Sequence, residues 1–106
     1  MIPMPILESE HLVLRRPELS DAAAVQEFLQ ERQIAANTLH IPFPYPKGAA
    51  EAWVARTQSA YDAGEACSFA IVLKDEDLLI GAVALKLDLE HRRGELGYWI
   101  GKPYWN

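Results

Sequence analysis

Residues 68–85 read SFAIVLKDEDLLIGAVAL, which is two apolar runs separated by the acidic turn 74–77. Short runs rich in branched apolar side chains are typical of β-strands. A turn this short joins antiparallel strands as a hairpin. After a charged turn at 90–93, residues 94–100 (GELGYWI) form a third run of the same kind. The three runs and their short turns predict an antiparallel meander.

Upstream of the meander, the sequence predicts one more strand and a helix. Residues 11–15 (HLVLR) alternate in period two and are followed by Pro17, which indicates a strand. Ser20 is placed to cap a helix that runs to about Arg32, with Asp21 near the positive end of the helix dipole. The apolar stripe of this helix comprises Ala22, Val25, Phe28 and Leu29.

A second helix is predicted from about Gly48 to Ala63, with Gly64 as the residue that ends it. Between the helices, the alternate prolines of residues 41–46 (IPFPYP) forbid regular helix or ladder pairing, so a stiff, extended loop is predicted there. The order strand, helix, helix, strand, strand, strand predicts an α+β fold in which both helices pack on an antiparallel sheet.

Composition limits the classes of function. A chain of 106 residues forms one domain at most, and a formal net charge of −5 argues against nucleic acid as a partner. No apolar run approaches the roughly 20 residues that span a bilayer, so no membrane partner is expected. Cys67 is the only cysteine, which rules out an internal disulfide and favours a reducing, cytoplasmic setting. The opening residues MIPMP do not have the pattern of a signal peptide.

Three stretches carry a resemblance to a known family. Residues 7–17 (LESEHLVLRRP) resemble the opening strand, T-E-R-L-x-L-R, of RimJ/RimL-type acetyltransferases, with His11 where an arginine is usual. Residues 79–81 (LIG) resemble the hydrophobic-Ile-Gly of their third strand. Residues 95–100 (ELGYWI), followed by 103–105 (PYW), resemble their fourth strand. The chain is therefore similar, over nearly its whole length, to the N-terminal part of a GCN5-related N-acetyltransferase (GNAT).

The resemblance implies an enzyme that transfers acetyl from acetyl-CoA to a primary amine, on a protein N-terminus or a small molecule, by direct attack in a ternary complex. Family members continue with an Arg/Gln-x-x-Gly-x-Gly/Ala loop for the pyrophosphate, and the six glycines here do not form that pattern. Residues 1–106 are therefore expected to be a truncated GNAT domain, lacking this loop and the C-terminal half, and inactive alone. Alternatives are a non-catalytic half-domain that binds another protein and, more weakly, a small-ligand binder of another family.

The resemblance also implies roles for residues of the last predicted strand. Carried over by position, Trp99, Ile100 and Gly101 would supply backbone contacts to pantetheine where this strand bulges, and the Ile100 N–H would donate to the oxyanion. The alternative is an apolar strand in a core. Glu95 is a candidate general base, or else a solvent-facing residue that pairs with an arginine of the preceding turn.

Acceptor contacts are expected in the segment between the helices, which borders the acceptor site in the family. Asn37, His40 and Tyr45 are candidates there; the alternative for His40 is an ordinary loop histidine. Tyr98 is either sheet packing or a wall of the substrate site. Three histidines and one cysteine form no ligand-spaced cluster, so no metal site is expected. Loss of the later strand and helices predicts self-association or a homodimer through an exposed sheet edge.

Overall fold

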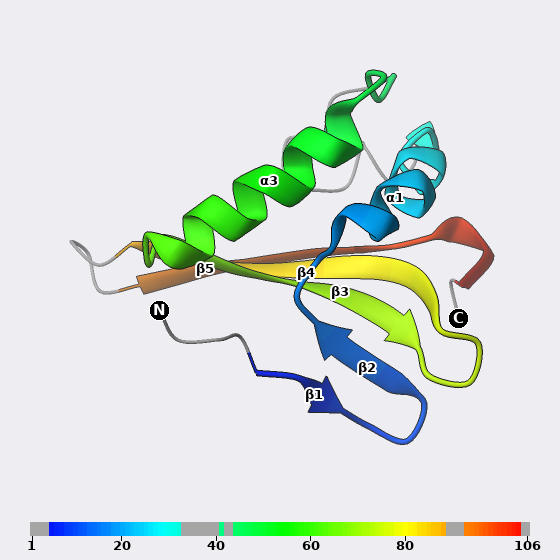
Figure 1. Ribbon diagram of the computed structural model, residues 1–106, viewed down its shortest axis with the longest axis horizontal. Helices are drawn as coiled ribbons and strands as arrows, with labels where there is room; N and C mark the ends of the chain where they lie inside the picture. The colour runs from blue at the N-terminus through cyan, green and yellow to red at the C-terminus, as the bar shows by residue number, and fades with distance from the viewer. Residues whose placement is uncertain (1–4, 33–40, 42–43, 89–92, 105–106) are drawn as a thin grey trace.

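The computed structural model describes residues 5–32, 41, 44–88 and 93–104. These residues form an antiparallel five-stranded sheet in the order β1-β2-β3-β4-β5, and the helices lie on one of its faces (Figure 1). The α+β class predicted from the sequence is confirmed. The strands are β1 (Leu7–Glu8), β2 (Leu12–Arg15), β3 (Ala66–Leu73), β4 (Leu78–Asp88) and β5 (Arg93–Ile100). The helices are α1 (Ala22–Phe28) and α3 (Ala49–Asp62), with 3₁₀ turns η1 (Leu19–Asp21) and η2 (Lys102–Tyr104).

The predicted first strand is present as β2, and the two-residue strand β1 precedes it. Leu7 pairs with Leu14, and Ser9 forms the turn between the two strands. The Ser9 N–H donates to the Leu12 carbonyl at 2.8 Å, and the Ser9 hydroxyl accepts the Leu12 N–H at 3.1 Å. β1 was not predicted because two residues carry no measurable periodicity.

The predicted start of the first helix is wrong. Ser20 is not the cap: the turn η1 begins after Glu18, and α1 begins only at Ala22. The Asp21 carboxylate accepts the Glu18 N–H at 2.7 Å, which satisfies a donor at the start of the turn. α1 also ends at Phe28, several residues before the predicted end at Arg32.

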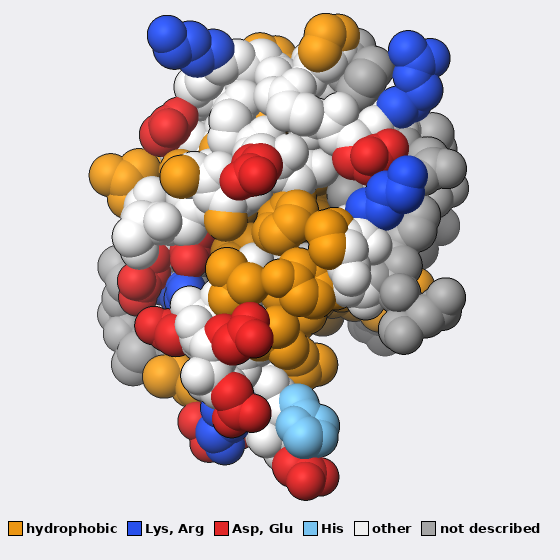
Figure 2. Space-filling model, turned by 90° about the vertical axis from the view of Figure 1, so that its right-hand side faces the viewer, with side chains coloured by type: hydrophobic (Ala, Val, Ile, Leu, Met, Phe, Trp, Pro, Cys, Tyr) orange, Lys and Arg blue, Asp and Glu red, His pale blue; other side chains and the backbone are white. Residues whose placement is uncertain are grey.

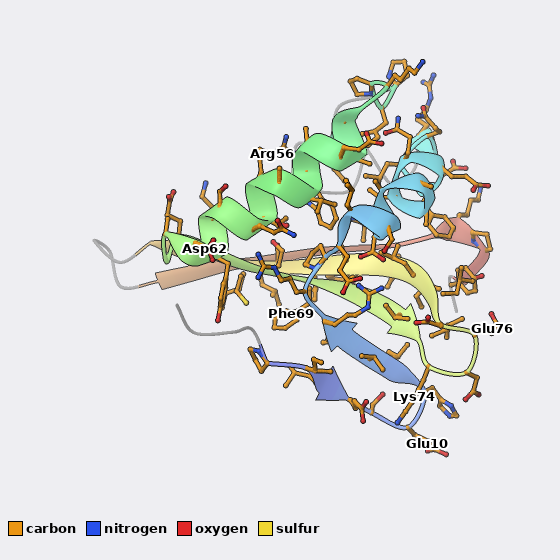
Figure 3. The ribbon with its side chains drawn as sticks, viewed as in Figure 1. Glu10, Arg56, Asp62, Phe69, Lys74 and Glu76 are labelled. Atoms are coloured by element: carbon orange, nitrogen blue, oxygen red, sulfur yellow. The ribbon has the colours of Figure 1, made fainter. Side chains whose placement is uncertain are left out.

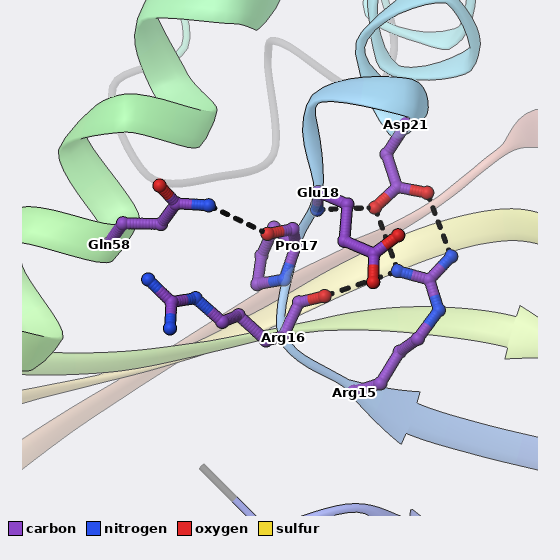
Figure 4. A network of polar contacts seen from close by, with 6 residues as sticks. All are labelled: Arg15, Arg16, Pro17, Glu18, Asp21 and Gln58. Atoms are coloured by element: carbon purple, nitrogen blue, oxygen red, sulfur yellow. Dashed lines mark hydrogen bonds and ion pairs between the residues drawn. The ribbon is translucent and has the colours of Figure 1, made fainter. Parts of the chain in front are cut away.

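Asp21 joins the end of β2 to the helix layer (Figure 4). Its side chain is only 5% exposed, and its two oxygens accept hydrogen bonds from the Arg15 guanidinium at 2.9 and 2.8 Å. The hydrogen bond to Asp21 raises the pKa of Arg15, so the cation persists at any ordinary pH. From α3, Gln58 donates to the Pro17 carbonyl at 3.4 Å. The chain therefore leaves the sheet along a path fixed by a bidentate ion pair.

α3 ends as the sequence predicted. Gly64 has a left-handed φ of 74°, the Gly64 N–H donates to the Tyr61 carbonyl, and the Glu65 N–H donates to the Ala60 carbonyl. This double hydrogen bond is the Schellman arrangement, which favours glycine because a side chain is strained at such a φ. The predicted 74–77 hairpin is also present, with Asp77 at a φ of 48°.

The core between helices and sheet depends on an extra residue in β4. Val72 pairs with Leu79 whereas Ile71 pairs with Gly81, so Ile80 has no partner in the register and forms a bulge. Because of this bulge, Leu79 and Ala82 both reach the core although they are three positions apart. The resemblance implied a bulge in the strand at 94–100, where it splays from the next strand of the family, and this remains a prediction; against β4 the register of this strand is continuous from Gly81 to Asp88.

The sheet face opposite the helices is apolar. The register alternates sides, so the strand positions paired with Phe69 and Cys67 share this face: Val83, Tyr98, Leu85 and Leu96. Tyr98 and Leu96 are both largely exposed. Figure 3 shows Phe69 on the side of the sheet away from α3. Figure 2 views the molecule from the right-hand side of Figure 1 and not onto this sheet face; hydrophobic side chains gather in the middle of that view, with acidic side chains near them.

The Arg15–Asp21 pair provides the first prediction. Asp21→Ala leaves the half-buried Arg15 guanidinium without its partner, and we expect the free energy of unfolding to fall by about 3 kcal/mol. Replacing both charges, as Arg15→Met with Asp21→Leu, should cost less than Asp21→Ala alone, because no unpaired charge remains. Urea denaturation measures both. Glu27→Ala, at an exposed position of α1, is the control and should change stability by less than about 0.5 kcal/mol. Equal losses for Asp21→Ala and Glu27→Ala would contradict this role.

Candidate active site

The predicted backbone contacts with pantetheine and the oxyanion involve residues at the end of β5. The Gly101 N–H donates to the Ile80 carbonyl at 2.7 Å. Backbone groups of successive residues alternate between the two sides of a strand. Those of Trp99 and Gly101 are therefore directed toward β4, and those of Tyr98 and Ile100 toward the outer edge of the sheet. β5 stands last in the strand order, so this outer edge is the rim of the described sheet.

A close backbone contact gives the physical reason for glycine at the end of the stretch 79–81. A Cβ at position 81 would lie 2.3 Å from the Trp99 carbonyl oxygen and 3.2 Å from the Ile100 Cα. Both obstacles are backbone atoms, so no side-chain rotation removes them. Position 81 must be glycine for β4 and β5 to approach as closely as they do beside the bulge.

Gly101 admits an aromatic ring on the other face of β5. A Cβ there would lie 2.7 Å from Cδ1 and Cε1 of Phe28, which belongs to α1. The Phe28 ring also lies 6.1 Å from the Trp99 ring at an interplanar angle of 55°, and 6.2 Å from the Tyr104 ring at 81°. Such tilted and edge-to-face pairs are favourable aromatic geometries. Phe28 therefore contacts the chain on either side of Gly101.

The three predicted cofactor residues differ in what their backbone groups do. Ile100 alone directs its backbone toward the outer edge. The Gly101 N–H is used by Ile80, and the Gly101 carbonyl accepts the Tyr104 N–H at 2.9 Å. Trp99 pairs with Ala82, and its side chain is 5% exposed within the core. Cofactor contacts by these residues remain predictions; the direction of its backbone distinguishes Ile100 from the other two.

Glu95 lies in β5 with its Cα opposite that of Lys86. Ile100 lies five positions after Glu95 in the extended strand, and a rise of about 3.4 Å per residue puts their Cα atoms about 17 Å apart. A proton could pass from an amine beside Ile100 to Glu95 only through bridging water. The role of Glu95 as a base stays a prediction with that condition attached.

Of the four predicted acceptor residues, the structure describes Tyr45 and Tyr98, and these two lie on opposite faces of the sheet. Asn37 and His40 lie outside the described residues. Tyr45 is buried in the core with Trp99, and burial raises the pKa of its phenol, which keeps it neutral. Tyr98 lies on the opposite face of the sheet. Substrate contact by any of the four remains a prediction.

Two glutamines that the sequence did not single out fix the Tyr45 backbone. Gln26 of α1 and Gln30, two positions after its end, donate to the Tyr45 carbonyl at 3.3 and 3.0 Å, and Gln26 also donates to the Pro46 carbonyl at 2.8 Å. The Gln26 side-chain oxygen then accepts the Ala50 N–H at the start of α3. One amide thus connects α1, the proline segment and α3. No sequence signal marks this role, because glutamine is an ordinary residue of a helix surface.

Metal binding, cysteine nucleophilicity and membrane spanning have little support among the residues that the structure describes. Those residues hold no group of three or more His, Cys, Asp or Glu side chains that could bind a metal. Cys67 is partly buried, and burial raises the pKa of its thiol, which disfavours the nucleophilic thiolate. Neither described helix has the length and apolar character needed to cross a bilayer.

Comparison with known proteins shows to which family this fold belongs. The family described as Acetyltransferase (GNAT) domain matches residues 11–106. The chain belongs to the GNAT acetyltransferase family. Its similarity to RimJ/RimL-type members, expected from residues 7–17, 79–81 and 95–105, is confirmed by relatives of that type.

Three relatives illustrate the match. An uncharacterised N-acetyltransferase, p20, of Bacillus licheniformis is 28% identical over 103 residues, which cover 96% of this chain and 57% of p20. A Vibrio cholerae protein provisionally assigned as a ribosomal-protein-serine acetyltransferase is 26% identical, with a TM-score of 0.74 over 98% of this chain and 59% of that one. RimL, a ribosomal L7/L12 α-N-protein acetyltransferase solved with coenzyme A, shares the fold at 16% identity, with a TM-score of 0.80 over 96% and 59% of the two chains. This GNAT chain therefore spans less than two thirds of the length of these relatives.

The close contact at Gly81 provides the second prediction. Gly81→Ala should lower the free energy of unfolding by about 3 kcal/mol, at the upper end of overpacking costs, because the added methyl meets backbone. Ile100→Ala in the same chain should not restore this loss, since the Trp99 carbonyl remains in place. Thermal and urea unfolding followed by circular dichroism measure both.

Gly64→Ala is the matched control for Gly81→Ala. Nothing lies within 4 Å of a Cβ at position 64, so only the strain of a positive φ remains, about 1 kcal/mol. If Gly81→Ala cost no more than Gly64→Ala, the close approach of β4 and β5 would not be a constraint on the fold.

Proposed function

We propose that this chain is the N-terminal part of a cytoplasmic N-acetyltransferase that transfers acetyl from acetyl-CoA to a primary amine. The observation that carries the proposal is the end of β5, where Ile100 directs backbone groups toward the sheet edge in a chain that matches the GNAT family over residues 11–106. A RimL structure of the same fold contains coenzyme A. Acceptors to consider are a protein N-terminal amine and a small-molecule amine.

In the proposed reaction a neutral amine attacks the thioester carbonyl directly. The C–N bond forms, the C–S bond breaks, and CoA leaves as a thiolate that takes up a proton, while the amine nitrogen gives up one. The Ile100 N–H would donate to the carbonyl oxygen as it becomes negative, a contact typically worth about 3–4 kcal/mol. Glu95 would accept the amine proton through water. No described residue is assigned as the acid for the thiolate.

Among the described residues, those at the end of β5 fit the pantetheine and thioester end of acetyl-CoA. An extended amide chain can pair with backbone groups at the outer edge of β5, as a strand would. A pyrophosphate needs a helix N-terminus or a nest of backbone N–H groups. None of the six glycines of the sequence stands in a Gly-x-Gly pattern that would form such a nest. The net charge of −5 offers no general attraction for phosphate in its place.

A second candidate function is a non-catalytic half-domain that binds another protein. The exposed apolar side chains of Leu85, Leu96 and Tyr98 favour it, because a contiguous exposed apolar patch often marks a protein–protein interaction site. The two candidates differ in whether acetyl-CoA is turned over.

The enzymatic proposal gives the third prediction. The complete protein, mixed with acetyl-CoA and a panel of protein N-terminal peptides and small amines, should release CoA with at least one acceptor. Acetyl-CoA at a hundred times its dissociation constant should also stabilise it by about 2.7 kcal/mol. An absence of both turnover and stabilisation would favour the binding module.

The fourth prediction concerns the 106-residue chain alone, which we expect to associate and to bind acetyl-CoA poorly. Leu96→Lys should shift the chain toward monomer in light scattering, because it places a charge on the apolar face at the β5 edge. Leu19→Lys is the control, since Leu19 is 66% exposed and Leu96 68%, but Leu19 lies in η1. Micromolar acetyl-CoA binding by a clean monomer in calorimetry would overturn this prediction.

A further inference from the structure

The last residues of β5 are enclosed from both faces by contacts that only glycine allows. On the face away from the helices, Gly81 lies against the Ile100 Cα and the Trp99 carbonyl. On the helix face, the Phe28 ring lies directly against Gly101. The backbone between these two contacts is the part proposed to meet the thioester.

The three described atoms nearest to a Cβ at position 101 all belong to the Phe28 ring. It also contacts the rings of Trp99 and Tyr104, which lie two residues before and three residues after Gly101. One turn of chain beyond Phe28, Glu31 lies 3.9 Å from the Lys102 ammonium. Phe28 at the end of α1 and Glu31 beyond it therefore contact the chain at several points from Trp99 to Tyr104.

We propose that Phe28 is a positioning residue for acyl transfer, holding the backbone of Trp99, Ile100 and Gly101 where the Ile100 N–H must meet the developing oxyanion. The inference rests on the proposed function. Phe28 touches neither substrate nor reacting atoms in this account. It acts through Gly101. Because glycine has no side chain, the Phe28 ring packs directly on the main chain at this position.

Such positioning matters because an oxyanion donor is effective only over a narrow range of distances from the oxygen. The donor must lie about 2.7–3.1 Å from the oxygen in the transition state. A displacement of about 1 Å, caused by a residue remote from the chemistry, can cost about a hundredfold in rate. Since Gly101 has no side chain, removal of the Phe28 ring leaves a gap that no rotamer of residue 101 can fill.

The first test measures hydrogen exchange in the 106-residue chain and needs no activity. Phe28→Ala should accelerate exchange of the Gly101 amide, which is bonded to Ile80, by about tenfold or more beyond any change in global stability. Val54→Ala is the control: Val54 is buried in α3 and lies outside the core cluster that contains Trp99. It should lower stability without selectively exposing Gly101.

A rescue variant separates positioning from general damage. Phe28→Ala combined with Gly101→Ala places a methyl group where the ring edge had been. The double variant should recover part of the lost protection at residues 101 and 104, although Gly101→Ala alone is disruptive. This positive coupling is expected only if the ring and Gly101 are in direct contact.

The second test measures kinetics in the complete protein. Phe28→Ala should lower kcat by about 10- to 100-fold with little change in the KM for acetyl-CoA, whereas Val54→Ala should leave both near normal. Unchanged Gly101 exchange, or equal kinetic losses in the two variants, would overturn the positioning role. A wild-type protein without transferase activity would instead overturn the proposed function, while the exchange result still decides whether Phe28 holds β5.

Discussion

The constraint on which the rest of the structure depends is the close packing of main chain around the end of β5. Gly81 lets two strands approach until a carbonyl oxygen occupies the place of a side chain, and Gly101 does the same for an aromatic ring. With these contacts made, Trp99 enters the core beneath α1 and Ile100 is directed to the sheet edge. A fold that needs two side-chain-free positions within one small region has little freedom in how β4, β5 and α1 are placed.

The sequence was informative wherever structure is decided locally. The hairpin at 68–85 and the end of α3 at Gly64 follow from turn residues and periodicity, and both are present. The prediction of Ser20 as the cap was wrong because Asp21 accepts hydrogen bonds from Arg15, a partner on another element that no local pattern reveals. The bulge at Ile80 was equally hidden, since residues 78–85 are apolar at almost every position and show no break in alternation.

The candidate site was predictable in part for the same reason. The resemblance located the strand at 95–100, but only the register distinguishes Ile100, whose backbone faces outward, from Trp99 and Gly101. The separation of Glu95 from Ile100 also follows from the extended strand, and it agrees with a base that would act through water. Phe28 belonged to a predicted apolar stripe, yet its contact with Gly101 depends on how two distant segments pack. In the proposed function the chain provides the acyl-transfer end of a GNAT site, and it spans 57% and 59% of the length of two of its relatives.

The most direct test of this account is a crystal structure of the complete protein with coenzyme A. We expect the pantetheine arm to lie along the outer edge of β5 with its sulfur near the Ile100 N–H, and the Phe28 ring to remain against Gly101. Coenzyme A bound away from β5, or an Ile100 N–H directed into the sheet, would contradict the account.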